Sequence, residues 1–514
     1  MNTSRRTHLV RSTGIVIGAF VAAKALGLAR ELVIGRQFGT GGAIDAYYAA
    51  FQIPDLLFTL IAGGALVTAF LPVFTEYLVQ GDTRGAWEVA SAVTNLVLVV
   101  TAVLAGAVAL LAPVIVERVV APGFDPARQA LTVDVMRIIL ASTVVFGVSG
   151  IQMGILNAYQ HFLLPAVAPA MYNLGIIAGA LILAPRWGVH GLAAGVVVGA
   201  VLHLGVKIPG LMRYGMQYSP VLGLRHPGVR QVAWLMGPRV LALGMVKLTF
   251  LVNTNLASRL GEGSVAALSY AWHVMQLPET LFATAVAIVV FPTLAEFAAR
   301  GQTEALRSAL ADTLRVIFVL TVPAAVGLIV LGRPLIALLF QRGAFDARST
   351  EMVYFALQFY ALALIGHAVL EIAARLFYAQ KDTLTPFKVA TVSMLANVVL
   401  SLTLIRVLSY GGLALANALA FTLEASILLW IGRGRLGGLE VGRILDGLVR
   451  IGLAALVMGA AIIGLQRRLP YSSPLVIGAT GLALGGLIYL AAILALGLHE
   501  ARTLPKLVLR RLTR

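Results

Sequence analysis

The sequence contains no cysteine and little charge, and both shortages narrow what the protein can be. None of the 514 residues is Cys, which excludes disulfides, thiolate metal sites and cysteine nucleophiles. Charged residues make up 12% of the chain and hydrophobic residues 59%. A soluble surface needs far more charge, so the composition indicates an integral membrane protein without a sizeable soluble domain.

Motifs that would support catalysis are also missing. The sequence has no Walker A lysine motif, no HExxH and no serine nucleophile elbow, so ATP hydrolysis and membrane-protease chemistry have no residues to carry them. The GxGxxG pattern at 432–437 follows an apolar run rather than a strand, which favours a basic loop. His190, His203 and His367 lack metal-ligand spacing. We therefore expect no enzyme, metal or cofactor, and energy from the membrane potential or a monovalent cation.

Apolar runs of membrane-spanning length recur along the whole chain, separated by short polar or Gly/Pro-containing breaks. They predict an all-α membrane protein of about fourteen helices. The predicted spans are residues 13–37, 44–77, 86–114, 130–158, 163–185, 189–212, 230–258, 264–298, 306–331, 349–379, 386–405, 411–432, 443–466 and 474–497.

The formal net charge of +17 does not indicate a nucleic-acid-binding surface, because Lys and Arg are spread over short loops. Basic residues are about twice as frequent in the loops on the side of the N-terminus, among them Lys207, Arg213, Arg225 and the tail from Arg502 to Arg514. By the positive-inside rule, both termini are expected in the cytoplasm of a bacterial inner membrane.

The chain contains an internal repeat. Phe124 matches Phe345, Pro165 matches Pro386 and Gly191 matches Gly412, and each pair differs by 221 residues (345 − 124, 386 − 165 and 412 − 191). Residues 53–58 match 277–282, and the Pro and Glu of 71–76 match those of 291–296, at spacings of 224 and 220. A repeat of six helices gives two copies with the same orientation in the bilayer.

The repeat predicts three parts: a first lobe at 1–215, a second lobe at 216–436, and a helix pair with a basic tail at 437–514. Two same-direction six-helix lobes around a central cavity are typical of a transporter that works by alternating access. Duplication alone does not establish transport, because fold and function are separable.

Several charges fall inside the predicted helices, where an ionisable group costs on the order of 3 kcal/mol. Lys24, Arg30 and Glu31 lie in the first helix, and Asp45 lies in the second. Lys24 and Arg30 are six positions apart, or roughly 9 Å along the axis. We interpret them as binders of an anionic substrate, with Glu31 and Asp45 balancing part of the charge; the alternative is that Arg30 and Glu31 are interfacial.

The second half of the chain adds Lys247 and Arg375 to the candidate binders. Glu371 precedes Arg375 by four residues, the favourable order for a helical ion pair. Arg375 could therefore bind substrate or simply pair with Glu371, which would then balance its charge.

Breaks within the helices are candidate hinges or cavity-lining points. Pro54, Gly63 and Gly64 interrupt the second helix, and Pro278 interrupts the eighth. Such breaks remove backbone hydrogen bonds and are tolerated in membranes where they line a cavity or allow movement. Ordinary kinked packing is the alternative.

The sequence closely resembles the MurJ (MviN) lipid II flippase family of the multidrug/oligosaccharidyl-lipid/polysaccharide exporter superfamily. The likeness extends through all fourteen helices. The motifs that carry it are LGLARE at 26–31, FG at 38–39, DAYYAAF at 45–51, IPDLL at 53–57, AFLP at 69–72, APGF at 121–124, LNA at 156–158, PAVAP at 165–169 and MGP at 236–238.

The resemblance implies a flippase that moves the undecaprenyl-diphosphate-linked peptidoglycan precursor from the inner to the outer leaflet by alternating access. It implies a polyprenyl-diphosphate substrate, membrane lipid and the envelope-synthesis machinery as partners. Arg30 and Asp45 match the family pattern directly, Glu31 replaces an Asp, and Lys24 falls where the family has a functional arginine. Lys keeps that charge but lacks the bidentate fork.

Five positions depart from the family pattern. Phe58 and Thr59 replace a basic pair, Gly63 replaces a Glu, and Trp272 and His273 replace an Asp-Arg pair. His273 can supply a positive charge only when it is protonated. The alternatives are therefore a transporter of another polyprenyl-linked glycan or amphipathic molecule, of the polysaccharide-flippase or drug/cation-antiporter type, or a non-transporting envelope scaffold.

Overall fold

The computed structural model describes residues 3–62, 64–468 and 473–498. Within these ranges every regular element is a helix and no strand occurs. Two compact units are present: Met1–Ala266 with Arg342–Ala344, and Ala267–Gln341 with Phe345–Arg514. The division falls after Ala266, whereas the lobe boundary predicted from the repeat lies at 215/216. The predicted boundary, which follows the repeat rather than the packing, stays a prediction.

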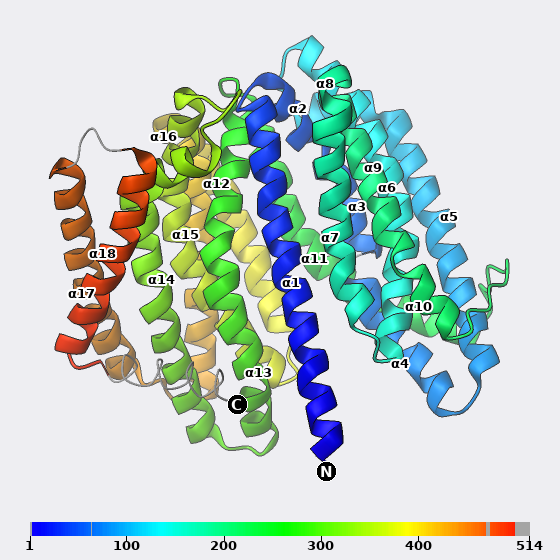
Figure 1. Ribbon diagram of the computed structural model, residues 1–514. Coiled ribbons are helices and arrows are strands. Elements are labelled where there is room, and N and C mark those ends of the chain that lie inside the picture. Colours follow the sequence, from blue (N-terminus) through cyan, green and yellow to red (C-terminus); the bar gives the residue numbers. More distant parts are fainter. Residues whose placement is uncertain (1–2, 63, 469–472, 499–514) are drawn as a thin grey trace. The chain divides into compact units, whose positions relative to one another are not determined.

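Unit 1 contains the first eleven α-helices and three π-helical segments (Figure 1). Some consecutive segments continue one another as a single long helical rod, as do those of Gly42–Val79. In chain order the segments of unit 1 are α1 (Thr3–Phe38), α2 (Gly42–Ala50), α3 (Gln52–Leu57), η1 (Phe58–Ala62), α4 (Gly64–Val79), α5 (Thr83–Ile115), η2 (Val116–Val120), α6 (Pro126–Ala158), α7 (Leu163–Ala178), η3 (Gly179–Leu183), α8 (Ala184–Trp187), α9 (Val189–Gly205), α10 (Ile208–Arg213) and α11 (Pro227–Ser258).

Unit 2 contains the remaining helices, beginning with α12, whose first turn still belongs to unit 1. In chain order these are α12 (Ser264–Pro278), η4 (Glu279–Thr284), α13 (Ala285–Ala299), α14 (Thr303–Phe340), α15 (Ala347–Ala379), α16 (Leu384–Arg435), α17 (Val441–Arg468) and α18 (Pro474–Ala495).

Eleven helical rods of the described chain are long and apolar enough to span a membrane. The charged α1 and α11 are not among them. The rod α16 is two helices joined at Ser409, whose backbone is non-helical. With α1, α11 and the two halves of α16, the described helices agree with the fourteen predicted spans.

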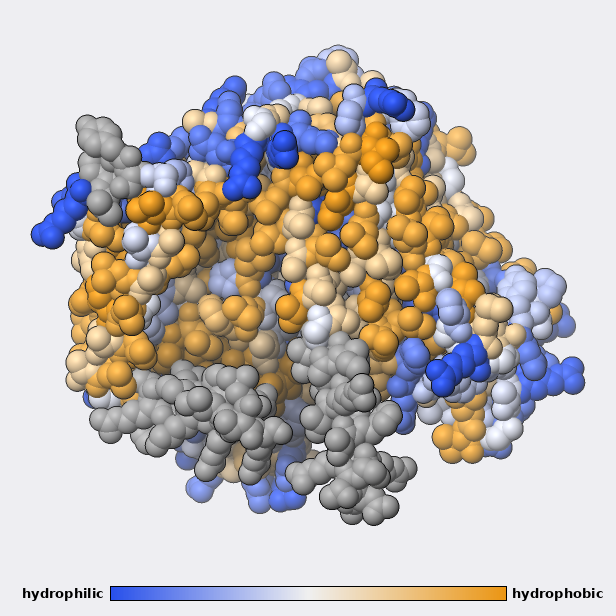
Figure 2. All heavy atoms as spheres, viewed as in Figure 1, coloured by the Kyte–Doolittle hydropathy of each residue, from blue (hydrophilic) through white to orange (hydrophobic). Residues whose placement is uncertain are grey.

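Apolar side chains are exposed on the flanks of these helices, as expected for surfaces that contact lipid. Leu453 and Leu456 on α17 and Leu482 and Leu487 on α18 are examples. Figure 2 shows hydrophobic residues along this flank, with hydrophilic residues gathered at the helix ends. The protein is therefore an all-helical, multi-pass membrane protein.

The predicted repeat is visible in the backbone of the two units. Gly188 has φ 55° and ψ −137°, and Ser409, 221 residues later, has φ 50° and ψ −138°. The turns at Gln160 and Lys381, again 221 apart, have φ 57° and 61°. Each pair marks the same turn between helices, so the spacing found in the sequence corresponds to repeated local structure.

Glycines allow α7 and α9 to pack unusually closely in unit 1. A Cβ atom added at Gly175 would lie 2.2 Å from the Cα of Gly199, and one at Gly179 would lie 2.4 Å from the Cα of Gly195. Small residues four apart are a general means of bringing membrane helices together. This packing fixes α7, which carries Asn173 next to α1.

Candidate functional site

The charged residues of α1 form a hydrogen-bonded cluster with α2 and α7 inside unit 1. The guanidinium of Arg30 donates to the carboxylate of Glu31 and, at 3.1 Å, to Oδ1 of Asn173. The hydroxyl of Tyr48 donates to Glu31 at 2.8 Å. The Nδ2 of Asn173 donates to the carbonyl of Ala23 at 3.2 Å, which orients the amide toward Arg30.

In this cluster the guanidinium of Arg30 is partly exposed, whereas the carboxylate of Glu31 is buried. The side chain of Glu31 is 3% exposed, whereas that of Arg30 is 21% exposed. Because Glu31 and Asn173 use only part of the five-donor fork, Arg30 keeps N–H groups that can bind an anion. Glu31 thus fixes the position of Arg30, the balancing role predicted for it.

A second cationic residue of unit 1, Lys247 on α11, forms an ion pair with Asp55 on α3. Both side chains are partly exposed, at 29% and 42%. Lys24, six residues before Arg30 on α1, is exposed. Of the predicted binders, Lys24, Arg30 and Lys247 therefore all belong to unit 1.

Asp45 is not part of the Arg30 cluster. It is 1% exposed, and its two carboxylate oxygens accept hydrogen bonds from the backbone N–H of Gly263 at 2.6 Å and of Ala266 at 2.7 Å. Glu262 in turn accepts from the backbone N–H of Gly42 at 2.6 Å. Asp45 and Glu262 therefore cap the first turns of α12 and α2, since helix N-termini carry unpaired donors.

Unit 2 contains the other predicted binders. Arg375 is ion-paired with Glu371 on the same helix, as the spacing of four residues predicted. His273 lies on α12 directly after Trp272 and is partly exposed. Close to these residues, His367 lies 3.3 Å from Glu279.

The predicted hinge positions coincide with breaks in helix geometry. Proline has no N–H to bond the carbonyl four residues earlier, and α2 ends at Ala50, four residues before Pro54. The π-helices η1 and η4 follow Pro54 and Pro278. A Cβ atom at Gly64 would meet no neighbour within 4 Å, and Gly63 lies outside the described residues. Hinge motion at these positions stays a prediction.

Two of the five positions that depart from the family pattern, Phe58 and Trp272, make aromatic contacts. Phe58 lies against Phe146, with ring centroids 5.1 Å apart. Trp272 lies against Tyr360 at 5.4 Å and against His367 at 6.2 Å. Aromatic contacts thus occupy two places where charge was expected.

Several residues of these clusters were missed or misplaced by the sequence. Asn173, Tyr48 and Glu424 were not singled out, although Glu424 lies in an apolar run, where an ionisable residue is itself a functional signal. Lys207 was placed in a loop but is 0% exposed; its ammonium donates to the carbonyl and hydroxyl of Ser149, both at 2.6 Å.

No group of three or more His, Cys, Asp or Glu suited to a metal ion occurs in the part of the chain that the structure describes. The described charges form ion pairs, helix caps and hydrogen bonds instead.

The fold defines the class: an all-helical, multi-pass membrane protein whose fold is shared with solved membrane transporters. The solved structure titled inward-facing conformation of a multidrug resistance MATE family transporter of the MOP superfamily matches with TM-score 0.70 at 16% identity, covering 82% of this chain and 98% of that one. Within that class, a family model described as lipid II flippase MurJ matches residues 34–477. The chain belongs to the lipid II flippase MurJ family.

Individual relatives agree with this assignment. The lipid II flippase MurJ of Burkholderia cenocepacia is 35% identical over 438 residues, covering 84% of both chains. The probable lipid II flippase MurJ of Rhizobium meliloti is 31% identical over 470 residues, covering 88% of this chain and 86% of its own. A solved structure titled lipid II flippase MurJ, inward closed conformation, shares the fold with TM-score 0.81 at 24% identity, covering 97% and 99%.

Proposed function

We propose that this protein is a flippase that moves the undecaprenyl-diphosphate-linked peptidoglycan precursor, lipid II, from the inner to the outer leaflet by alternating access, and so supports cell-wall synthesis. The observation that carries the proposal is the relative named lipid II flippase MurJ, 35% identical over 84% of both chains. The partly open Arg30 fork is consistent with binding of a diphosphate.

The headgroup site in this proposal is built on unit 1. Arg30 binds diphosphate oxygens through its remaining N–H groups, and Lys24 adds a second positive charge on the same helix. Lys247 contributes when it leaves Asp55. The other predicted binders, His273 and Arg375, belong to unit 2, where Arg375 is paired with Glu371.

The lipid tail and the surroundings follow from the same proposal. The polyprenyl chain stays in the bilayer along α17 and α18, whose exposed side chains are largely apolar. Both termini lie in the cytoplasm, transport is driven by the membrane potential or a monovalent cation, and the envelope-synthesis machinery is the protein partner. The repeat lobes 1–215 and 216–436 are the halves that move in alternating access, and the breaks at Pro54, Gly64 and Pro278 are their hinges.

Complementation tests the function most directly. We expect the gene to rescue growth of a bacterium depleted of its own lipid II flippase. Variants Lys24→Ala and Arg30→Ala should each reduce rescue, and unchanged growth in both would contradict the headgroup site. Arg84→Ala is a matched control, because Arg84 is exposed and its ion-pair partner among the described residues is Glu88, one helical turn away.

A second candidate function is favoured by the aromatic residues at positions where the family pattern has charge. Phe58 packs on Phe146, and Trp272 packs on Tyr360, which suits a transporter of another polyprenyl-linked glycan. Failure to rescue by a correctly inserted protein that still binds a polyprenyl diphosphate would support this candidate over lipid II. Failure of both would support a scaffold.

A further inference from the structure

Unit 2 has a buried acidic centre at its π-helix. Glu279, the first residue of η4, is 6% exposed. Its carboxylate accepts hydrogen bonds from the hydroxyls of Thr280 at 3.3 Å and Thr284 at 3.1 Å. The Nδ1 atom of His367, on α15, lies 3.3 Å from the same carboxylate.

Two more carboxylates face His367. Glu371 lies one turn further along α15, and Glu424 approaches from α16; both are close enough to act on the imidazole electrostatically. The guanidinium near them, Arg375, is already paired with Glu371. Glu279 and Glu424 therefore have no ion pair with Lys or Arg among the described residues, and the carboxylates that act most strongly on His367 are those of Glu279, Glu371 and Glu424.

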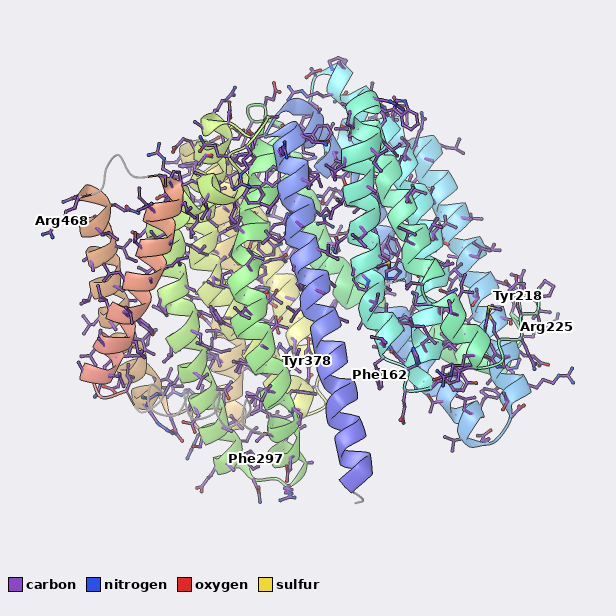
Figure 3. The ribbon with its side chains drawn as sticks, in the orientation of Figure 1. Phe162, Tyr218, Arg225, Phe297, Tyr378 and Arg468 are labelled. Carbon is purple, nitrogen blue, oxygen red and sulfur yellow. The ribbon has the colours of Figure 1, made fainter. Side chains whose placement is uncertain are left out.

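The rest of the environment of His367 is aromatic. Its ring packs edge-on against Phe421, with centroids 4.8 Å apart, and against Trp272, at 6.2 Å. Tyr378, labelled in Figure 3, lies further along α15 and interacts electrostatically with Glu424, Glu371 and Arg375. The side chain of His367 is nevertheless 23% exposed, so it can exchange a proton with water, whereas that of Glu279 is 7% exposed.

The backbone at this point is also irregular. A π-helical segment inserts an extra residue into the helical ladder, and such segments occur frequently at functional sites. Here the segment directly follows Pro278, which removes one backbone hydrogen bond. Glu279 therefore lies where the helix can change shape at low cost.

From these observations we propose that His367 and Glu279 form a proton-binding site in unit 2. One proton from water adds to the imidazole, which then carries a positive charge next to Glu279 and Glu424; release returns the proton to water. Histidine is the side chain suited to this exchange near neutral pH. That this exchange drives transport rests on the proposed flippase function, whereas the binding itself does not.

The fluorescence of Trp272 can report on the protonation of His367, because a protonated imidazole quenches the fluorescence of an indole ring in contact with it. The purified protein in detergent is titrated from about pH 5 to about pH 8, the range in which histidine changes charge. The signal of Trp272 is the difference between the wild type and Trp272→Phe, which keeps the other four tryptophans. We expect this difference signal to fall as the pH is lowered.

Variants assign the quench to the site. His367→Gln and His367→Asn should each abolish it, and Glu279→Gln should move its midpoint to lower pH by about one unit, because a carboxylate favours the charged imidazole. His190→Gln, an exposed histidine 4.0 Å from Asp134 in unit 1, is the matched control and should leave the quench unchanged. A Trp272 signal that does not depend on pH in the folded wild type would overturn the proposal, as would one that responds to sodium at constant pH instead.

A flipping assay in liposomes separates this proposal from the proposed function. We expect the wild-type rate to depend on the pH gradient and the His367→Gln rate to be insensitive to it. A quench without pH-dependent transport would overturn the coupling. A quench in a protein that moves no lipid-linked substrate would leave the site standing and contradict the flippase function.

Discussion

The two units repeat the same turn geometry but differ in the charged residues that they cluster. Unit 1 holds Arg30 and Lys247 next to one carboxylate each, with Lys24 in addition. Unit 2 holds Glu279, Glu371 and Glu424 around one arginine and one histidine. The comparison teaches that turn geometry and intramembrane chemistry are separable: the turns match between the two units, whereas the charges do not.

The turns are retained because they depend on local backbone requirements. Asp125 accepts from the backbone N–H of Arg128 at 3.0 Å, and Asp346 accepts from that of Ser349 at 2.7 Å; both begin a long helix. Such a cap needs only one acceptor at one position. A charge inside the membrane, in contrast, depends on partners from other helices and can change when they change.

The largest expected effect tests whether unit 1 alone carries the cation for the substrate. Arg30→Ala should lower the flipping rate about tenfold or more, because a hydrogen bond to a charged group is lost, whereas Arg375→Ala should lower it much less. The measurement is the initial rate in liposomes, with Arg30→Lys as the variant that keeps charge but loses the fork. An equal loss of flipping rate in Arg30→Ala and Arg375→Ala would show that unit 1 alone does not supply the cation.

The next effect concerns the matched turns at Gly188 and Ser409. Both have φ near 50°, a region that costs a non-glycine residue about 1–3 kcal/mol. We expect Ser409→Gly to stabilise the protein by about 1 kcal/mol and Gly188→Ala to destabilise it by a similar amount. Unfolding in detergent measures both. A change of the same sign in both variants would show that the two turns are not equivalent.

A smaller effect is expected at the two helix caps. Asp346→Ala should destabilise the protein by about 0.5 kcal/mol through loss of one backbone hydrogen bond, and Asp125→Ala should change stability in the same direction. Replacement by Asn, which also accepts from the backbone, is the control and should recover most of the loss. A loss of stability in only one of the two variants would show that the units share the geometry of the cap but not its contribution to stability.

The smallest expected effect is the pH dependence of stability at two equivalent turns, at Asp382 and at His161. Hydrogen bonds from Thr385 and the Arg435 guanidinium lower the pKa of Asp382 to about 2. Because this pKa is depressed, Asp382 adds stability above its ordinary pKa, and that stability is lost as the pH falls toward 2. Asp382→Asn should therefore flatten the acid limb of a thermal-stability profile slightly.

The equivalent position in unit 1 is His161, 221 residues earlier. Burial and the charge of Arg213 lower the pKa of His161, so the folded protein prefers the neutral ring. Stability should then decrease slightly as the pH falls below the ordinary histidine range, and His161→Gln should remove that decrease. A stability that rises on acidification in this range would contradict the assignment.

Helix number and the repeat could be predicted because both depend on local sequence. Apolar length sets the spans, and Pro and Gly at constant spacing mark the turns. The ends were less accurate: the span predicted at 306–331 continues as α14 to Phe340. It does so past Arg333, which pairs with Glu351 on α15, so a polar end does not stop a helix whose charge has a partner.

The sequence by itself determined the membrane class, the all-helical fold and the internal repeat, since hydrophobicity and backbone restrictions act within a few residues. Only the tertiary structure decided the chemistry of the charges. It joined Arg30 to Asn173, used Asp45 as a helix cap, buried Lys207 against Ser149 and placed His367 beside Glu279. The reason is that an ionisable group in a membrane is defined by its partners, which lie on other helices and far away in the chain.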